Sequence, residues 1–462
     1  MALIRRLAVL LALLDLAALV LAFNLAIAGY LRGGPNVHGI IFLPLLAPFA
    51  ILVLALYLID GYKSRTDMIS VDYTSQHIIA LGSALVATLL LTYTIIPEGY
   101  PLQQSRVVIA LSFFLLTPVT LGYRRLIYQL LLRRRGQRTL IFLGNRSSCA
   151  LFQEECARIG LDLPVVFSTS DTTAVGEAGD GLKLELFDDL LARVQRGEFS
   201  AEAIVVRESN RELRPDLAEQ LVDLYFSGVP TYTLELFHQV YWQKIPLYRI
   251  NPTWLFQEGF QVAREPVFER LKRLSDIVLS LVGLLASALP IALAALAIKL
   301  EDGGPVFFLQ TRIGKNHRPF RLIKLRTMRQ PPADQPASAD LYTQKDDARI
   351  THVGKLLRTM RLDELPQMWN VLRGDMSLIG PRAEWDRLVE DYGRQIPCYH
   401  FRHLVKPGIT GWAQVNYPYG ASIEDTIRKL EYDLYYIRHF SFVLDASIAL
   451  KTIHIMLFGK GR

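Results

Sequence analysis

The sequence predicts a membrane protein of three parts: an N-terminal four-helix transmembrane bundle, a Rossmann-like α/β middle domain, and a C-terminal, mostly helical α/β domain with a re-entrant membrane helix. Three observations lead to this fold class. Of the 462 residues, 51% are hydrophobic, above the usual share of a soluble protein, and the excess lies near the start. Strand and helix patterns then alternate, and a later apolar run is interrupted by Pro290. The expected domains are residues 1–135, 136–264 and 265–462.

The predicted bundle consists of four apolar runs. Each is near the ~20 residues that a helix needs to cross a bilayer. No convincing small-residue cleavage site follows the first run, so we expect a retained helix and not a removed signal peptide. The runs are Leu7–Leu31, Gly39–Ile59, His77–Ile96 and Val107–Leu132.

Lysine and arginine residues set the predicted orientation. Arg5 and Arg6 precede the first run, Lys63 and Arg65 follow the second, and an arginine cluster at 124–138 ends the fourth. The positive-inside rule therefore places both ends of the bundle in the cytoplasm. The net charge of +7 suits contact with anionic lipid and anionic substrates. No nucleic-acid-binding module is recognisable, so nucleic acid is not an expected partner.

The middle domain has the rhythm of a parallel sheet. The predicted elements are a strand at Thr139–Leu143, a turn at Gly144–Asn145, a helix at Ser147–Ile159, and further strands at Leu163–Ser168 and Ala203–Val206. A dinucleotide fingerprint needs several glycines in the first turn, whereas only Gly144 stands here. We therefore favour a degenerate, non-catalytic or regulatory domain over a working nucleotide site. A flexible excursion is expected at Pro331–Asp340.

A fifth apolar run, Ile277–Ile298, is long enough to span the membrane. A straight span would export everything that follows, including many Lys and Arg residues. Pro290 removes a backbone donor and favours a bend, so that a re-entrant helix at about 274–300 keeps both flanks on one side. Ser287, one turn earlier, is the expected partner for backbone groups freed at this break. The alternative is a straight span that the proline merely kinks.

The most informative stretch is the adjacent carboxylate pair Asp363 and Glu364, which lies directly before Pro366. Neighbours on a helix point about 100° apart, so the two carboxylates are not expected to be buried together. Lys324 and Arg326 lie upstream, and Arg382 follows a glycine-proline turn. Cations, carboxylates and a glycine turn together indicate phosphate chemistry.

From Lys272 onward the chain resembles the bacterial sugar transferase domain of monotopic polyprenyl-phosphate hexose-1-phosphate transferases, the phosphoglycosyl transferases. The N-terminal helices and the middle domain resemble the long members of this family, which start exopolysaccharide, capsule or O-antigen repeat units. The motifs that carry the resemblance are Gly304–Phe308, Gln310–Gly314, Lys324–Met328, Arg361–Gln367, Ser377–Arg382, Lys406–Val415 and Tyr432–Ile437.

The resemblance implies transfer of a sugar-1-phosphate from a UDP-sugar to undecaprenyl phosphate at the cytoplasmic face of the bacterial inner membrane, with UMP as the second product. It implies that Asp363 forms an aspartyl phosphosugar intermediate and that Glu364 binds Mg²⁺. Lys324, Arg326 and Arg382 would hold phosphate oxygens, and Asp433 would join the metal or base cluster. Membrane lipid is an expected partner, and a homodimer is left open.

Several of these residues have a plainer interpretation. Asp363 and Glu364 are compatible with the acidic first turn of a helix. Lys324 and Arg326 alternate as on a solvated strand face, and Asp433 has the spacing of a surface pair with Lys429. Trp412 and three tyrosines near Asp433 suit interfacial anchors or substrate stacking equally well; the tyrosines are Tyr432, Tyr435 and Tyr436.

The sequence also departs from the family pattern. A Ser-Pro pair usually marks the re-entrant break, whereas two residues separate Ser287 from Pro290 here. The stretch from Tyr417 to Ser422 replaces the glycine- and arginine-rich segment of glucose-specific members. A polytopic transferase would need roughly ten spanning helices, which the hydropathy pattern does not offer. The alternative function is a non-catalytic scaffold or regulator of polysaccharide assembly.

Overall fold

The computed structural model divides into two compact units. The first comprises residues 1–49, 62–74 and 89–243, and the second comprises residues 50–61, 75–88 and 244–462. The structure describes residues 2–30, 42–63, 66, 68–69, 71–96, 98–99, 101–135, 138–161, 163–177, 181–198, 200–207, 215–247, 266–329, 347, 349–417, 420 and 422–458. The predicted excursion at Pro331–Asp340 lies outside these residues, as does Arg65.

Four described helices are long and apolar enough to cross a membrane, which indicates a membrane protein. They contain the segments Leu7–Gly29, Tyr73–Ile95, Arg106–Leu130 and Val267–Asp302. The second predicted run begins outside the described residues, and its described helical part, Leu43–Leu58, is a shorter apolar helix. The helices are α1 (Ala2–Tyr30), η1 (Leu43–Leu45), α2 (Leu46–Leu58), α3 (Val71–Leu90), η2 (Leu91–Ile95), η3 (Pro101–Gln104) and α4 (Arg106–Arg135).

Helices α1 and α4 are joined by a buried ion pair. Arg124 Nη1 lies 2.7 Å from Asp15 Oδ1, and neither side chain is exposed. The hydroxyl of Tyr62 donates to Asp15 Oδ2 at 2.7 Å. Arg124 was expected in the cytoplasmic arginine cluster that sets orientation; instead its side chain is buried and paired inside the bundle. A charge in this setting needs such a partner, because burial in low dielectric is costly when it is unpaired.

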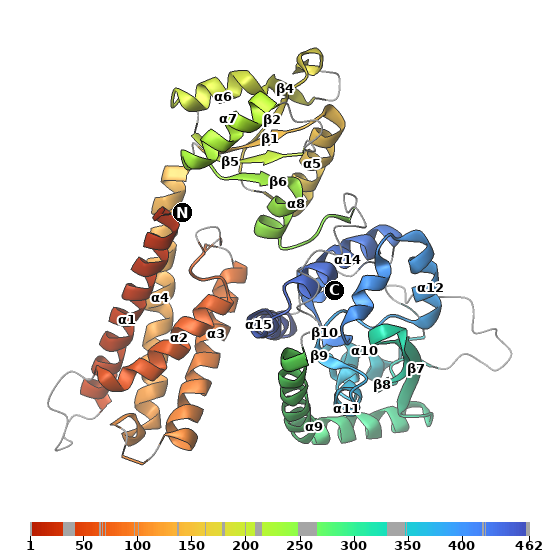
Figure 1. Ribbon diagram of the computed structural model, residues 1–462. Coiled ribbons are helices and arrows are strands. Elements are labelled where there is room, and N and C mark those ends of the chain that lie inside the picture. Colours follow the sequence, from red (N-terminus) through yellow and green to blue (C-terminus); the bar gives the residue numbers. More distant parts are fainter. Residues whose placement is uncertain are drawn as a thin grey trace. The chain divides into compact units, whose positions relative to one another are not determined.

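The α/β part of the first unit is a six-stranded sheet in the order β3-β4-β2-β1-β5-β6. All its pairs are parallel except β3 with β4 (Figure 1). The predicted strand–turn–helix start and the next two strands are confirmed, with the doubly wound order of a Rossmann-like sheet. Its elements are β1 (Arg138–Leu143), α5 (Arg146–Ile159), β2 (Val165–Thr169), η4 (Thr172–Ala174), β3 (Gly176–Glu177), β4 (Lys183–Leu186), α6 (Phe187–Gln195), β5 (Ser200–Val206), α7 (Pro215–Phe226), β6 (Thr231–Thr233), α8 (Leu234–Phe237) and η5 (His238–Trp242).

Helices cover both faces of this sheet, because successive strand residues point to opposite sides. Leu140 and Phe142 pack with α5, α8 and η5, whereas Ile141 and Leu143 pack with α6 and α7. A strand buried on both faces reads as a continuous apolar run, and the stretch of residues 140–143 in β1 is such a run.

The second unit continues with one long helix, an antiparallel hairpin and a layer of shorter helices (Figure 1). Strands β9 and β10 form a separate parallel pair. The elements are α9 (Pro266–Asp302), β7 (Phe307–Ile313), η10 (Lys315–His317), β8 (Pro319–Leu325), α10 (His352–Thr359), η11 (Leu362–Glu364), α11 (Gln367–Arg373), β9 (Ser377–Ile379), α12 (Asp386–Gln395), η12 (Tyr399–Leu404), β10 (Gly408–Thr410), α13 (Trp412–Asn416), α14 (Ile423–Arg438) and α15 (Phe442–Phe458).

Helix α9 runs unbroken through Pro290 but changes direction along its length, as Figure 1 shows. Proline frees the carbonyl four residues earlier, that of Ala286. Ser287 Oγ was expected to serve this break, yet it donates to Gly283 O at 2.6 Å, one turn earlier than itself. Such back-bonding by serine also bends helices.

The largest core of the second unit lies between α12, η12, α14 and α15. Trp412 and Tyr436 belong to this core and are almost completely buried. The Tyr436 hydroxyl donates to Asp445 Oδ1 at 2.8 Å. These two aromatic residues are therefore structural, and the expectation that they act as interfacial anchors or stacking platforms is wrong.

Candidate active site

The carboxylate pair lies in a short 3₁₀ turn, η11, whose entry is strained. Arg361, directly before it, has φ of 58° and ψ of 19°, a left-handed conformation that non-glycine residues seldom adopt. Asp363 is 8% exposed, whereas the Glu364 side chain is 15% exposed and faces a pocket. The two carboxylates thus point to different surroundings, as expected. Backbone strain of this kind tends to persist where the surroundings fix a functional geometry.

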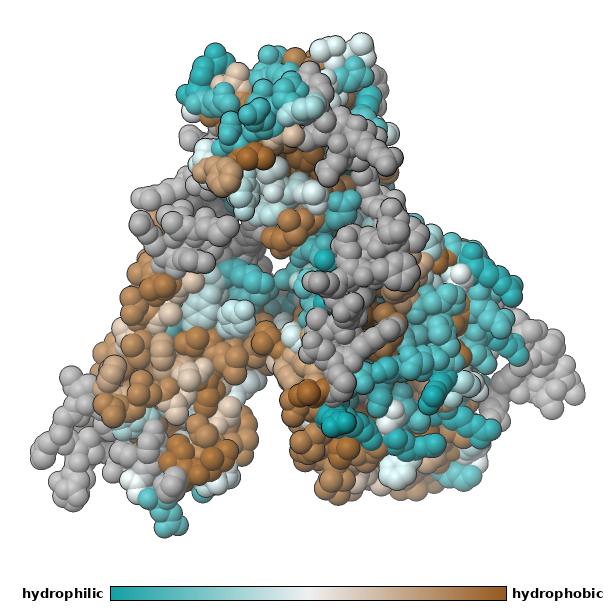
Figure 2. All heavy atoms as spheres, in the orientation of Figure 1, coloured by the Kyte–Doolittle hydropathy of each residue, from teal (hydrophilic) through white to brown (hydrophobic). Residues whose placement is uncertain are grey.

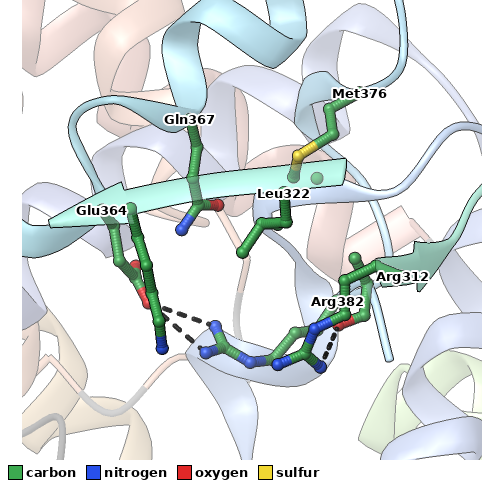
Figure 3. A pocket seen from close by; sticks show the side chains of 9 residues that line it. Arg312, Leu322, Glu364, Gln367, Met376 and Arg382 are labelled. Carbon is green, nitrogen blue, oxygen red and sulfur yellow. Dashed lines mark hydrogen bonds and ion pairs between the residues drawn. The ribbon is translucent and has the colours of Figure 1, made fainter. Parts of the chain in front are cut away.

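The pocket is open and has about 340 Å³ of free space, part of it solvent. Three of the predicted residues, Lys324, Glu364 and Arg382, line it together with Arg312 (Figure 3). The β7–β8 hairpin, η11 and the turn after β9 bring these groups together. The complete lining is Arg312, Leu322, Lys324, Glu364, Gln367, Met376, Arg382, Ala383 and Gly408.

Two arginines on this pocket make polar contacts with the protein: Arg382 through a carboxylate and its own backbone, and Arg312 through a backbone carbonyl. The guanidinium of Arg382 lies 3.3 Å from Glu364 Oε1, and its own carbonyl oxygen accepts from Arg402 Nη2 at 3.0 Å. Arg312 Nη1 donates to the carbonyl of Ala383 at 3.1 Å. The fixed guanidinium groups suit oxyanions, because their planar donors match the geometry of phosphate.

The charges of Asp363 and Lys324 influence each other's pKa at the edge of the pocket. Burial raises the pKa of Asp363, and Glu364 adds to this, while Lys324 and Arg358 oppose it. Burial and the charge of Arg312 lower the pKa of Lys324 to about 8, against the opposing effect of Asp363. The Lys324 ammonium also lies 5.0 Å from the Phe308 ring centroid. In general, a carboxylate that has lost much of its hydrating water reacts more readily with a phosphate group that neighbouring cations hold beside it.

Besides Asp363, which lies beside the pocket, two further predicted catalytic residues lie outside the pocket lining. Arg326 is buried and forms an ion pair with Asp302 at the end of α9. Asp433 is 1% exposed, and its Oδ2 accepts from Arg402 Nη2 at 3.0 Å. Burial raises the pKa of Asp433 to about 6. The interpretation of Arg326 as part of a solvated strand face is therefore wrong. The interpretation of Asp433 as the partner of Lys429 in a surface pair is wrong as well.

The residues present fit Mg²⁺ held jointly with a substrate. Among the described residues, no group of three or more His, Cys, Asp or Glu side chains has the spacing to hold a metal ion. Mg²⁺ commonly binds one or two carboxylates and completes its shell with water and substrate phosphates. Glu364, which lines the pocket beside Arg382, offers such a ligand.

Comparison with known proteins places this pocket within a family. The family model described as bacterial sugar transferase matches residues 267–459. An uncharacterised sugar transferase of Bacillus subtilis is 40% identical over 195 residues, which are 41% of this chain and 89% of that protein. The chain belongs to the bacterial sugar transferase family. Every pocket residue lies within the matched range, so the chain carries its candidate site in the part that the family shares.

Longer relatives match over a smaller share of their own length. An Aeromonas hydrophila protein named UDP-N-acetylgalactosamine-undecaprenyl-phosphate N-acetylgalactosaminephosphotransferase is 39% identical over 273 residues, 59% of this chain and 63% of that protein. An Escherichia coli protein named UDP-glucose:undecaprenyl-phosphate glucose-1-phosphate transferase is 42% identical over 185 residues, 40% of this chain and 39% of that protein. The match thus spans less than two thirds of either protein.

Sequence reasoning missed three residues at this site of the sugar transferase: Arg312, Arg358 and Gln367. The signal for Arg312 was available in the hairpin, because alternate residues of paired strands share a face. Arg312 pairs with Phe320, which puts it on the same face as Leu322 and Lys324. Arg358, which donates to Thr327 Oγ1 at 2.8 Å, has no comparable signal, because only the tertiary fold brings α10 to the acidic pair.

The first turn of the α/β sheet, where a nucleotide phosphate would bind in a working Rossmann domain, is occupied by the chain's own side chains. Asn145 Oδ1 accepts from Ser148 N at 3.1 Å and from Arg207 Nη1 at 2.6 Å. A helix N-terminus binds anions through such free amide donors. Asn145 thus occupies one of these donors and also accepts a hydrogen bond from a nearby guanidinium; the degenerate role of the domain stays a prediction.

Proposed function

We propose that this chain transfers a sugar-1-phosphate from a UDP-sugar to undecaprenyl phosphate, with undecaprenyl-diphosphate-sugar and UMP as products. The observation that carries the proposal is the buried Asp363 next to Lys324 and beside a pocket lined by Glu364, Arg312 and Arg382. Anionic substrates need such cations, since both reactants are negatively charged. The names of the Aeromonas and Escherichia coli relatives describe reactions of this type.

In the first step an oxygen of Asp363 attacks the phosphorus that carries the sugar. The bond from that phosphorus to the bridging oxygen breaks, and UMP leaves with the electron pair. Lys324, Arg312 and Arg382 hold the phosphate oxygens and stabilise the charge that develops on them. The result is an acyl phosphate on Asp363 that bears the sugar.

In the second step a phosphate oxygen of the lipid attacks the same phosphorus. The bond to Asp363 breaks, the carboxylate returns, and the new diphosphate joins lipid and sugar. Mg²⁺ bound through Glu364 would neutralise phosphate charge. This division into two half-reactions predicts ping-pong kinetics and exchange of labelled UMP into the UDP-sugar.

The site in this proposal lies on the cytoplasmic face of the bacterial inner membrane, with α9 as a re-entrant helix. Contacts at both ends of α9 with one compact unit support this. Lys272 pairs with Asp445 of α15 near its start, and Glu301 accepts from the His352 amide at 2.8 Å near its end. Most exposed side chains between them are apolar, and Figure 2 shows hydrophobic surface along this helix. They include Leu274, Val278, Val282, Leu285, Leu289, Leu293 and Leu296.

Thiol labelling tests the topology. Cysteines placed at Arg270, near the start of α9, and at Gly303, directly after its end, are expected to be protected together from an impermeant reagent added outside intact cells. A cysteine in the loop before α4 at Gly99 serves as the externally labelled control. Labelling of only one flank would establish a true span.

UMP release from purified protein tests the reaction. A panel of UDP-sugars is offered with undecaprenyl phosphate and Mg²⁺, with UDP-glucose set against UDP-N-acetylgalactosamine because the relatives' names divide between these sugars. We expect one sugar to release UMP and to label the protein in the absence of lipid. Release that requires lipid in every case, with no labelled protein, would contradict the covalent intermediate. A folded protein inert toward the whole panel would favour a scaffold instead.

A further inference from the structure

The segment that follows the last helix of the first unit, Lys244–Leu247, packs as part of the second unit. Ile245 and Leu247 belong to the large core of that unit and are 1% and 7% exposed. Lys244 Nζ lies 3.2 Å from Glu431 Oε2 of α14, and both side chains are almost fully buried. An ion pair taken out of water in this way strongly penalises removal of one partner.

One residue of α14 holds this segment at three points. Besides the ion pair with Lys244, the carbonyl oxygen of Glu431 accepts from Ile245 N at 3.0 Å, and its Oε1 accepts from Leu247 N at 3.4 Å. Arg428 Nη1 also donates to Glu431 Oε1, at 3.3 Å. Glu431 is therefore fixed between its own helix and the incoming segment.

The same helix leads to the pocket through buried contacts. Asp433 lies two residues after Glu431 and binds Arg402 Nη2 at 3.0 Å. That nitrogen also donates to the carbonyl oxygen of Arg382 at 3.0 Å, and Arg402 Nη1 donates to Tyr399 at 2.8 Å. The backbone of Arg382 is thus held by a chain of contacts that begins at Lys244.

The two ends of this series of contacts differ in whether the family model covers them. The family match begins at residue 267, so Lys244 lies upstream of it, whereas Glu431, Arg402 and Arg382 lie within it. A residue outside the matched region therefore completes a buried charge inside it.

We propose that residues 244–247 form a positioning strap, which fixes α14 through Glu431 and so holds Asp433, Arg402 and the Arg382 backbone in register with the pocket. Lys244 acts through these residues and touches no substrate. The inference rests on the proposed function only in assigning Arg382 to the substrate phosphates. Loss of the contact between Lys244 and Glu431 would accordingly lower turnover without any change in the pocket's own residues.

The first test compares two lysine substitutions in the full-length protein. Lys244→Met keeps the length of the side chain but leaves Glu431 without this partner. We expect kcat/KM for UMP release to fall on the order of tenfold and the melting temperature to drop. The matched control is Lys183→Met, because Lys183 is 69% exposed and its partner Glu185 lies on the surface of the α/β sheet. The control is expected to change neither quantity.

A double-mutant cycle separates positioning from simple destabilisation. When Arg382 is already Ala, Lys244→Met should lower the melting temperature as before but change the remaining kcat/KM less than twofold. A full tenfold loss in both backgrounds would show that the strap acts only through stability. Lys244→Met combined with Glu431→Met should recover the melting temperature, because it removes both buried charges.

The outcomes for the strap and for the reaction remain distinct. If unmodified protein releases no UMP, the proposed function fails, while the melting temperatures of the Lys244, Lys183 and double variants still test whether the buried ion pair anchors residues 244–247 to α14. If Lys244→Met matches the unmodified protein in both melting temperature and kcat/KM, the strap is overturned and the reaction stands.

Discussion

Two polar turns of this chain are built in opposite ways. At the first turn of the α/β sheet, Asn145 caps α5 and accepts from Arg207, so the polar groups there satisfy one another. At the pocket, Asp363 has a raised pKa and Lys324 a lowered one, because burial opposes the charge of each. Satisfied polar groups contribute to folding, whereas groups held against their preferred charge state mark functional sites. From this difference we propose a structural role for the first turn and a chemical role for the second.

The sharpest way to break this comparison is Asp363→Asn. Asparagine keeps the size of the side chain but cannot form the acyl phosphate. We expect loss of the labelled protein and a fall in UMP release on the order of 10⁴ or more. The measurement is single-turnover UMP release from membranes, with folding checked by melting temperature. A folded variant with near-normal release would return the carboxylate pair to the role of a helix start.

Glu364→Gln addresses the metal. The amide is a weaker ligand for a hard cation, while Asp363 remains able to attack. The expected loss is on the order of 10², since a bound metal ion supplies several kcal/mol to such reactions. A titration of turnover against Mg²⁺ should show a higher requirement than in the unmodified protein. An unchanged Mg²⁺ dependence would remove Glu364 from the metal site.

Arg382→Lys tests whether the pocket needs a planar donor pair. A lysine ammonium keeps the charge but cannot bind phosphate in a fork, so kcat/KM should fall about tenfold to a hundredfold. Arg394→Lys is the matched control, because the side chain of Arg394 is 76% exposed and pairs with Glu390 at 4.0 Å on α12. Equal activity of the two variants would mean that charge alone suffices.

The pKa of Lys324 predicts an alkaline limit. Because its pKa is lowered to about 8, the ammonium loses its proton as pH rises through that value, and the pocket loses a phosphate-binding cation. We expect kcat/KM to fall above about pH 8, by about tenfold per pH unit at most. Lys324→Arg should move this limit to higher pH, because arginine stays protonated. A limit that stays in place in the arginine variant would belong to another group.

Parts of this architecture were readable from the sequence because a local pattern determines them. Residues 140–143 of β1 form a continuous apolar run, which is typical of a strand buried on both faces. The pocket was only partly predictable. Lys324, Glu364 and Arg382 come from three separate motifs that meet there, while Arg312 required the register of the hairpin.

The remaining differences arise from tertiary contacts that leave no local mark. Asp433 has the spacing of a surface pair, yet a buried arginine from η12 reaches it. Trp412 and Tyr436 have the composition of interfacial anchors but fill the core. Arg124 reads as a cytoplasmic flank, and only its contact with Asp15, more than a hundred residues away, shows that it is buried.

The smallest expected effect belongs to the first turn, where Gly144→Ala tests the structural side of the comparison. A Cβ at this position would lie 3.1 Å from the Phe142 ring and 3.4 Å from Arg207 Cβ, so neighbours must shift slightly. Crowding of this kind costs about 1 kcal/mol, and the melting temperature should fall modestly. Turnover per folded molecule should not change, because no step of the reaction passes through this turn. A variant that kept its melting temperature but lost UMP release would place a functional ligand site at Asn145 and reverse the assignment of the two turns.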